Sequence, residues 1–398
     1  MKKWKIYLFL LGMSFLLGSM GVQAEVSFAK APGKDKMKET LHWFHPRLDF
    51  STQYDDNIFL EPANEQDGFI FTTSPGLSIF VPFDGDRHLF SLDYQVDFLN
   101  FSEFGSQDFV AQSVRGTLDF NFPKFYVINS DMFRRTSLRS DTEFTERVDR
   151  NENTYNFAIG TKDWNRFSFE TGYNLFFTFY DDDSLDSIDR YEHVVRATGY
   201  YRLFTKTKAL LEYSHGFLIY PDDTNNRDGD YDQISAGLTG ELFTRMVGTA
   251  KAGYQNRDYD NGQDLSNLVV DLSVTEYFSP ETSLTVAYTR TAIESVFVTN
   301  DFYFTDYVSA TLDQKLFWNL NGVLGFSYQT NDYDETVTVD SVTGARNDDL
   351  YGVKAGVTYP FREWLTTGVE YNYYDRSSNF DDFDYNDNRV MWKVSAKY

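Results

Sequence analysis

The sequence predicts an all-β fold, namely a transmembrane antiparallel up-and-down β-barrel of about 18 strands, with 16 as the other possible count. Three observations support this prediction. Aromatic residues make up 18% of the 398-residue chain, yet the mean hydropathy is only −0.46. From Arg47 onward, apolar and polar residues alternate with a period of two, as in strands with one apolar face. The connections between these segments alternate between short and long, which is typical of a barrel that crosses a membrane.

Composition excludes several other classes of protein. The chain has no cysteine, which rules out a disulfide scaffold and a cysteine-based metal site. A net charge of −24 argues against a nucleic-acid partner. The 38 Phe and 28 Tyr residues also argue against intrinsic disorder, because disordered chains are poor in aromatic residues.

The N-terminal segment is predicted to be a signal peptide covering residues 1–24. Lys2, Lys3 and Lys5 precede an apolar run at 6–17, and small residues end at Ala24. A lone membrane anchor is the alternative, but the run is too short to span a bilayer. We expect residues 25–44 to form a flexible periplasmic arm, or else a docking tag or small plug, ahead of a barrel domain at 45–398.

Alternation defines the predicted strands. Phe90, Leu92 and Tyr94 lie on one face, whereas Ser91 and Asp93 lie on the other. Equivalent patterns recur around 167–179, 268–275 and 353–359. The segments run for about ten to fourteen residues, which is long for soluble strands and suits strands tilted across a bilayer. A soluble β-sandwich or propeller is therefore the weaker alternative.

Counting the connections gives the number of strands. Eight tight turns are predicted. Among them are the short connections at 123–124, 163–165, 244–246 and 279–282. Nine longer, Asp- and Asn-rich loops are predicted at 57–68, 103–108, 137–150, 181–189, 221–230, 260–265, 296–301, 334–348 and 375–384. Seventeen connections imply eighteen strands, and Tyr-Asp pairs spaced about 40 residues apart give the same count. An even number places both chain ends on the short-turn, periplasmic side.

The acidity of the chain is concentrated in and beside the long loops. Nine windows there hold 39 acidic residues, five Arg and no Lys, leaving a net charge of +10 for the rest of the chain. One interpretation is a solvated rim that meets lipopolysaccharide through divalent cations. The other is a negative mouth that attracts cations. No cofactor is expected, although Asp-rich loops such as 258–262 suggest Ca²⁺ without matching the EF-hand spacing.

The polar faces of the strands supply a predicted pore lining with both signs of charge. The mixture of positive and negative side chains implies a water-filled interior, because unpaired charges in a dry core are energetically costly. Candidate pore-lining residues are Asp93, Asp97, Arg115, Asp119, Glu170, Arg196, Arg202, Glu212, Glu241, Lys251, Asp271, Asp313, Lys315, Lys354, Glu370, Arg389 and Lys393, together with Lys162. Inward aromatic residues that could stack on sugar rings are Phe176, Tyr200, Tyr277, Tyr307 and Tyr374.

No catalytic residues are predicted, and the chain is interpreted as a non-enzyme. Ser214 and His215 are adjacent in a strand and therefore point to opposite faces, and the same holds for Glu192 and His193. The histidines show no metal-ligand spacing, so no metal site is expected. Serine-nucleophile, zinc-protease and phosphate-loop motifs do not occur in the sequence.

The final strand is predicted to carry an insertion signal. Its apolar face ends on a C-terminal aromatic residue, which resembles the signal by which outer-membrane barrels are recognised for insertion. The residues of this face are Val390, Trp392, Val394, Ala396 and Tyr398. The expected partners are therefore the barrel-assembly machinery, the outer membrane and its lipopolysaccharide.

Four segments resemble the putative β-barrel porin 2 group of bacterial outer-membrane proteins. They are YDDNIFL at 54–60, SPGLS at 74–78, FRRTS at 133–137 and RVDRNENT at 147–154. The resemblance implies an integral outer-membrane location in a Gram-negative bacterium. It also implies a role as the conduit for an exported exopolysaccharide, with a periplasmic export protein as partner. Loops of fifteen residues or fewer suggest a wide path. The alternatives are a general diffusion porin for small polar solutes and a non-conducting structural or adhesive barrel.

Overall fold

The computed structural model describes residues 43–139, 143, 146–222, 226–297, 300–339 and 342–398. The predicted signal peptide at 1–24 and residues 25–42 of the predicted arm lie outside this range. The first strand begins at Phe44, next to the predicted start of the barrel. No helix among the described residues is both long and apolar enough to cross a membrane.

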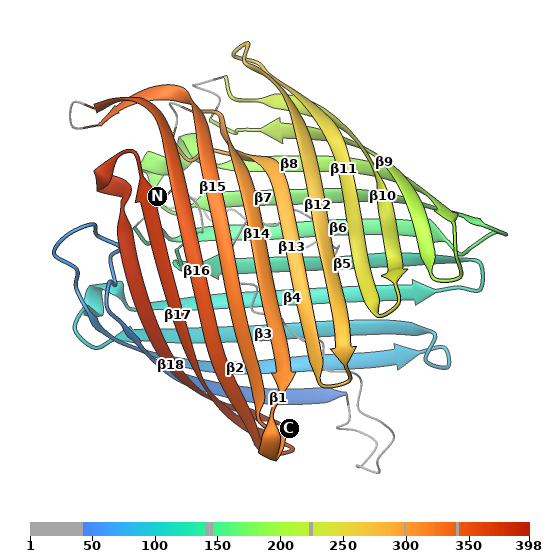
Figure 1. The fold of residues 1–398 in the computed structure, drawn as a ribbon, viewed down its shortest axis with the longest axis horizontal. Coiled ribbons are helices and arrows are strands. Elements are labelled where there is room, and N and C mark those ends of the chain that lie inside the picture. The colour runs from blue at the N-terminus through green and yellow to red at the C-terminus, as the bar shows by residue number, and fades with distance from the viewer. Residues whose placement is uncertain (1–42, 140–142, 144–145, 223–225, 298–299, 340–341) are drawn as a thin grey trace, which may run out of the picture.

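Eighteen antiparallel strands form one closed sheet, which confirms the predicted fold and strand count. Each strand pairs with the next in the chain, and β18 pairs with β1 to close the ring (Figure 1). The strands are β1 (Phe44–Asp55), β2 (Gly68–Phe83), β3 (His88–Phe101), β4 (Phe109–Asn121), β5 (Phe125–Thr136), β6 (Arg150–Thr161), β7 (Phe167–Tyr180), β8 (Arg190–Arg202), β9 (Thr207–Ile219), β10 (Gly229–Phe243), β11 (Met246–Tyr259), β12 (Asp264–Ser279), β13 (Thr282–Glu294), β14 (Phe302–Lys315), β15 (Asn321–Val339), β16 (Val342–Arg362), β17 (Leu365–Ser378) and β18 (Tyr385–Lys397).

Short 3₁₀ helices interrupt several connections. Those described are η1 (Gly105–Gln107), η2 (Asp183–Ile188), η4 (Phe317–Asn319) and η5 (Asp381–Phe383). The Asp182 side chain caps η2 by accepting a hydrogen bond from the backbone N–H of Ser184 at 2.9 Å. These helices sit in loops and turns and leave the strands as the only membrane-crossing elements of the described chain.

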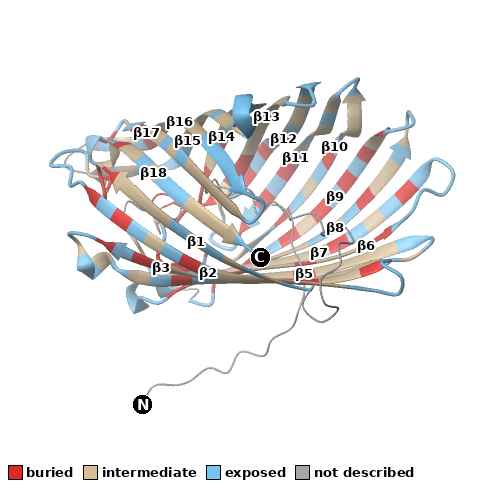
Figure 2. Ribbon diagram, turned by 90° about the horizontal axis from the view of Figure 1, so that it is seen from below, coloured by how far each residue is buried: buried red, intermediate tan, exposed pale blue. Residues whose placement is uncertain are grey.

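Strand pairing gives the sheet two chemically different faces. Leu48 and Phe50 are exposed on one face, and their partners on β18 are Ala396 and Val394. Arg47 and Asp49 lie between them on the other face. The apolar face is the outer, lipid-facing surface and the polar face is the inner wall. Burial alternates along the strands accordingly (Figure 2).

One predicted loop is wrong. The segment 334–348 is mostly strand, because β15 continues to Val339 and β16 begins at Val342. Thr336 to Val339 are all β-branched residues, which favour extended backbone and prolong the hairpin beyond the predicted loop start. Asp334, Glu335 and Asp348 therefore lie in the end of β15 and the start of β16.

Candidate functional site

The inner wall of the barrel holds the predicted pore-lining residues. Strand register puts them on the same face of the sheet as Arg47: Asp93 lies opposite Arg115, Lys251 opposite Asp271, and Asn372 opposite Arg389. The predicted inward aromatic residues share this face, for example Tyr307 opposite Thr289. Side-chain direction on a strand alternates, so the sequence period was enough to place these residues on one face.

A belt of alternating charges runs along one side of this wall. Arg196 Nη2 lies 3.5 Å from Glu170 Oε1, and Arg196 Nε lies 3.9 Å from Glu212 Oε2. Lys251 Nζ lies 2.9 Å from Glu212 and 3.6 Å from Asp271. The five residues come from β7, β8, β9, β11 and β12, in the order negative, positive, negative, positive, negative. A solute moving along this wall would meet paired charges of both signs.

The belt crosses β10 at a glycine. A Cβ on Gly237 would lie 2.7 Å from the Cβ of Lys251 and closer still to the Ala250 carbonyl oxygen. Glycine at this position lets the lysine stem reach across β10 toward β9. Tyr126 Oη donates a hydrogen bond to Glu170 and extends the belt to β5.

A second charge group lies on the opposite part of the ring. Arg47 makes a bidentate contact with Asp93, at 2.5 and 2.8 Å, and also donates to Gln95 and Ser78. Lys354 Nζ lies 2.9 Å from Glu370 on the neighbouring strand. Alternation predicted the face of Asp93 but not its partner Arg47, because β1 and β3 are separated by β2.

The remaining predicted residues lie nearer the two rims. Arg202 approaches Asp163 at 3.4 Å and Glu241 approaches Lys206 at 2.5 Å, both beside periplasmic turns. Arg389 lies 3.4 Å from Asp55 near the outer ends of β18 and β1. Asp97 accepts a hydrogen bond from Gln95 at 2.6 Å. Strand register places Asp119, Asp313, Lys315 and Lys393 on the same inner face.

The hairpin of β13 and β14 bends into the mouth of the barrel. Pairing between β12 and β13 ends at Val270 and Arg290, although β13 continues to Glu294. Beyond that point Glu294 forms a buried ion pair with Arg257 and accepts hydrogen bonds from Tyr220 (3.0 Å) and Tyr259 (3.1 Å). Arg257 lies on the inner face of β11, so the tip of the hairpin packs against the inner wall.

Loops from opposite sides of the ring meet over the lumen. Glu143, between β5 and β6, accepts hydrogen bonds from Ser295 Oγ (2.8 Å) and Val296 N (2.7 Å), between β13 and β14. These hairpins are eight strands apart in a ring of eighteen, so their contact must cross the mouth. Arg227, after β9, is 1% exposed and pairs with Asp301 at 3.1 Å.

Apolar contacts hold the same layer together. Val296 packs with Ile188 and Tyr180, and Ile58 packs with Ile70, Leu99 and Phe101. The guanidinium carbon of Arg346 lies 3.6 Å from the ring centre of Phe383, a cation–π contact that joins β16 to the last loop. We name these packed outer loops the mouth layer; its described anchors are Ile58, Glu143, Ile188, Arg227, Val296 and Phe383.

The mouth layer differs from the expectation that short loops stay apart, because loops from opposite sides of the ring are in contact. A loop of fifteen residues or fewer is too short to narrow the channel by itself. Several short loops cooperate instead, because each contributes one or two apolar or charged anchors to a shared packing. The sequence feature that could have predicted this packing is the presence of the apolar residues Ile58, Ile188 and Val296 within otherwise polar loops.

The C-terminal strand lies beside the first strand. Val390, Trp392, Val394 and Ala396 face outward opposite Tyr54, Thr52, Phe50 and Leu48. The Trp392 indole N–H donates to Thr367 Oγ1 at 3.0 Å. Tyr398 is 68% exposed, and its backbone N–H donates to the Pro46 carbonyl at 3.0 Å. The predicted insertion signal is therefore an accessible outer surface.

The side chains of Ser214 and His215 lie on opposite faces of β9. Ser214 lies on the inner face opposite Arg196, whereas His215 lies on the outer face and contacts Asp232 at 2.9 Å. Among the described residues, no group of three or more His, Cys, Asp or Glu side chains is arranged to hold a metal ion.

Comparison with known proteins identifies the family. The model described as putative beta-barrel porin 2 matches residues 42–398. No curated protein sequence matches the chain. Among solved structures, the outer-membrane protein OpdK of Pseudomonas aeruginosa has a TM-score of 0.51 at 12% identity, covering 89% of this chain and 99% of its own. OpdO of the same organism has a TM-score of 0.50 at 14% identity, covering 89% and 97%.

These structures have low sequence identity and establish the shared fold only. OccAB3 of Acinetobacter baumannii is similar to the same extent, with a TM-score of 0.50 at 11% identity and coverage of 89% and 99%. One OpdK structure contains vanillate, which is a property of that protein. Since the family model spans nearly the whole described chain, this protein is an integral outer-membrane β-barrel that belongs to the putative beta-barrel porin 2 family.

Proposed function

We propose that the barrel is a passive channel for small polar solutes and has no enzymatic activity. The observation that carries this proposal is an inner wall of paired opposite charges beneath a mouth narrowed by packed loops. Barrels of sixteen to eighteen strands enclose an aqueous lumen. A wall whose charges neutralise each other attracts neither sign of solute strongly, so size and polarity decide passage.

Export of an exopolysaccharide is the second candidate. It is supported by the resemblance of segments such as YDDNIFL at 54–60 to proteins that accompany polysaccharide export. A bulky polymer would require the contacts of Glu143 and Arg227 to open during each passage. The narrowed mouth therefore favours the small-solute proposal.

Transport through purified protein tests the proposal. Full-length barrel is reconstituted into planar bilayers for single-channel recording, and into liposomes for swelling assays with neutral sugars of increasing size. We expect conductance, with swelling by mono- and disaccharides and none by long oligosaccharides. Absence of both conductance and swelling would contradict the channel. Efficient entry of long oligosaccharides would contradict the narrow mouth.

Deletion of the gene separates the two candidates. Surface polysaccharide is measured in the deletion strain, and again after complementation with the wild-type chain. A normal amount of polysaccharide is expected if the barrel is a small-solute channel. Loss that is restored by the wild-type chain would instead support export and overturn our proposal.

A further inference from the structure

The wall of the barrel is split between β12 and β13 toward the extracellular side. Strand pairing there ends at Val270 and Arg290, although both strands continue beyond this pair. Over the same height β12 stays paired with β11, and β13 stays paired with β14. Among the described residues, no pair joins 264–269 of β12 to 291–294 of β13. The two strand edges therefore separate, and the sheet has a slit at this height.

The lower end of the slit lies at the edge of the apolar outer surface. Leu268 points outward from β12 and is 52% exposed, beside the outward Tyr254 of β11. The next outward residue toward the extracellular side is Ser266, and the strand begins at Asp264. Apolar outward residues face the hydrocarbon of the membrane, and polar ones lie beyond it. The slit therefore opens sideways at the boundary between the lipid chains and the head groups of the outer leaflet.

Apolar side chains fill the slit. Leu265, on the inner face of β12, belongs to the same packed cluster as Ala292 and Phe302 of the hairpin tip, and each of them is buried. The Tyr259 ring stacks on the Phe302 ring, with ring centres 5.8 Å apart. Val269, at the lower end of the slit on the same inner face, is also buried. The hairpin tip thus overlaps β12 from inside, and side-chain contacts take the place of strand pairing between the two layers.

Two hydrogen-bonding atoms without partners lie on the inner face of this region. Asn267, between Leu265 and Val269 on β12, is 7% exposed, and its side-chain nitrogen has no hydrogen-bond partner in the described chain. Gln255, opposite Asn267 on β11, is 3% exposed, and its side-chain oxygen likewise has no described partner. Leaving a buried donor or acceptor unpaired is unfavourable. These atoms therefore indicate a ligand that carries a small hydrogen-bonding group.

We propose that the slit is a lateral passage, through which an amphipathic molecule with one small hydrogen-bonding group moves from the mouth of the barrel into the outer leaflet. Its polar group pairs with Asn267 and Gln255, and its apolar part lies between Leu265 and Phe302. Apolar surface is favoured away from water, so such a molecule gains by leaving the aqueous lumen through the wall. This passage is separate from the path of polar solutes along the charged inner wall and does not depend on it.

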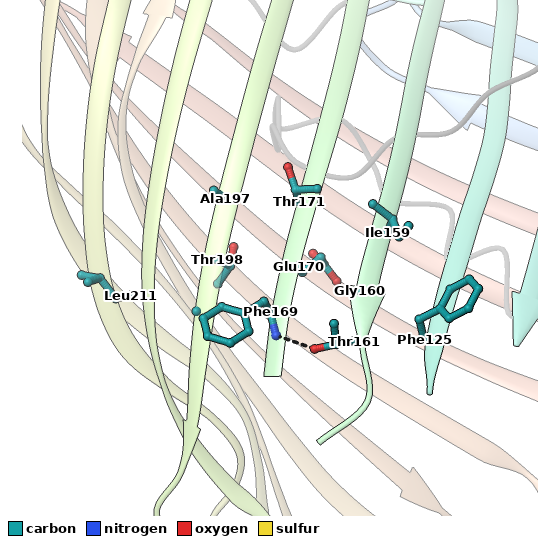
Figure 3. A pocket seen from close by; sticks show the side chains of 11 residues that line it. Phe125, Ile159, Gly160, Thr161, Phe169, Glu170, Thr171, Ala197, Thr198 and Leu211 are labelled. Atoms are coloured by element: carbon teal, nitrogen blue, oxygen red, sulfur yellow. Dashed lines mark hydrogen bonds between the residues drawn. The ribbon is translucent and has the colours of Figure 1, made fainter. Parts of the chain in front are cut away.

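A groove elsewhere on the outer surface has a closed wall behind it. Its volume is about 490 Å³, and it is lined by Phe125, Ile159, Phe169, Ala197 and Leu211 (Figure 3). The strands β5–β9 stay paired with each other at this height. A Cβ on Gly199, which also lines the groove, would meet only the Phe169 ring, at 3.7 and 3.8 Å. Gly199→Leu therefore fills an outer-surface groove without touching the slit.

Uptake of N-phenyl-1-naphthylamine by cells tests the proposal. This probe has apolar rings and one N–H group, fluoresces in apolar surroundings and is excluded by an intact outer membrane. The full chain is produced in cells with an intact lipopolysaccharide layer, and the initial rate of the fluorescence increase is measured. We expect a faster increase than in cells without the barrel. Asn267→Leu should lower the added rate about fivefold, because it removes one hydrogen-bonding group from the passage.

Closing the slit covalently separates lateral passage from entry through the lumen. The chain has no cysteine, so Val269→Cys combined with Thr291→Cys supplies two thiols directly above the last pair of β12 and β13. A short bifunctional methanethiosulfonate reagent bridges the thiols, and a reductant releases the bridge. Bridging should lower probe uptake to the level of cells without the barrel, and reduction should restore it. Swelling of liposomes by monosaccharides should be the same before and after bridging.

Matched variants distinguish the slit from general effects. Ser273→Cys combined with Ala287→Cys places the bridge on a pair lower on the same two strands and on the same face. Neither this bridge nor Gly199→Leu should change probe uptake, and heat-dependent gel mobility verifies that each variant is a folded barrel. Uptake that persists after residues 269 and 291 are bridged, or an equal loss in either control, would overturn the proposal, as would uptake no faster than without the barrel. Probe uptake without any sugar swelling would contradict the small-solute channel alone.

Discussion

At the scale of single residues, Asp131 is an acid on the lipid-facing surface. Register places it opposite Gly116 and Tyr155 on the outer face of β5. The Asn153 amide donates to its carboxylate at 2.5 Å, and Asn129 lies two residues away on the same face. An ionisable side chain on the lipid face of a barrel is destabilising, with a cost that depends on its depth.

Replacing this acid by an apolar residue should stabilise the protein. We expect Asp131→Leu to raise the free energy of unfolding by about 1–2 kcal/mol, because it removes a polar group from hydrocarbon. Urea titration of the barrel folded in detergent micelles measures the change, with Asp119→Leu on the inner face as the control. A decrease in stability for Asp131→Leu would indicate that the hydrogen bond from Asn153 to the carboxylate stabilises the barrel by more than the removal of a polar group from hydrocarbon does.

Lys251 holds two carboxylates of the inner wall. It is the only cation that the structure places within 4 Å of both Glu212 and Asp271 in the described chain. We expect Lys251→Gln to increase the cation-to-anion permeability ratio about two- to fivefold, because it leaves Asp271 without its counter-charge and leaves Glu212 with Arg196 alone. Reversal potentials in a salt gradient measure the ratio. Lys251→Arg, which keeps the charge, should behave as wild type, and an unchanged ratio in Lys251→Gln would place this belt away from the conducting path.

At the scale of elements, the ion pair of Glu294 with Arg257 is one of the buried contacts that hold the tip of the β13–β14 hairpin, together with those of Asp301 with Arg227 and of Val296 with Glu143. Glu294 and Arg257 are each 4% exposed in their side chains. Removing one partner of a buried pair leaves the other charge uncompensated, at a cost of about 3–5 kcal/mol. We expect Glu294→Gln to release the hairpin from the inner wall and to raise single-channel conductance. Thr289→Ala, lower on the same strand, is the matched control, and conductance equal to wild type in Glu294→Gln would contradict a narrowing role for the hairpin.

The contact between the β5–β6 and β13–β14 loops should respond to pH. Burial raises the pKa of the Glu143 carboxyl above its ordinary value, against the opposing effects of its hydrogen bonds to Val296 and Ser295 and of Arg346. A raised pKa means that the packed state binds the proton more tightly than the open state. Protonation of Glu143 therefore stabilises the packed state of the loops fully below the ordinary glutamate pKa of about 4.3. This stabilisation is lost as pH rises through the raised pKa.

Lower pH should consequently close the mouth. We expect conductance to fall as pH is lowered from 7 to 4, whereas Glu143→Gln should keep the low conductance at both pH values. Single-channel recordings at matched ionic strength test this expectation. A pH dependence that persists unchanged in Glu143→Gln would assign the effect to other acidic groups.

Alternation accounts for what the sequence could predict about these elements. It placed the strands, the turns and the inward face of residues such as Glu212 and Lys251, because direction on a strand depends only on residue parity. Alternation could not predict that these two side chains pair across β10. The order of the strands does not say how far a side chain extends over a neighbouring strand. The mouth layer was also missed, because contacts such as Glu143 with Val296 join loops 153 residues apart.

At the scale of the whole molecule, charge is distributed unevenly between the rim and the wall. The sequence windows in and beside the outer loops hold 39 of the 60 acidic residues. On the inner wall, by contrast, most acidic side chains lie close to a basic side chain. Charges at the rim act over the Debye length, which is about 30 Å at 0.01 M salt and about 3 Å at 1 M. The rim should therefore influence ions at low salt only.

We expect cation selectivity that disappears with salt. Reversal potentials should give a cation-to-anion permeability ratio of about two to five at 0.01 M and close to one at 1 M. Neutralising rim residues Asp182 and Asp183 together should lower the low-salt ratio and leave the high-salt ratio unchanged. Selectivity that is equal at both salt concentrations would locate its origin in the narrow part of the lumen instead.

The pairing of the last strand with the first governs how this molecule can be made. Arg47 lies opposite Lys397, so the seam joins residues 350 positions apart, and every shorter chain has two unpaired strand edges. A ribosome delivers β18 after the other seventeen strands, and the seam cannot form before β18 has been made. The nascent protein must therefore be kept from edge-to-edge aggregation for its whole synthesis and export. Once the seam is closed, β1 and β18 are neighbours. A circular permutant, in which β18 is linked to β1 and the chain is opened at another periplasmic turn, should therefore close the same ring.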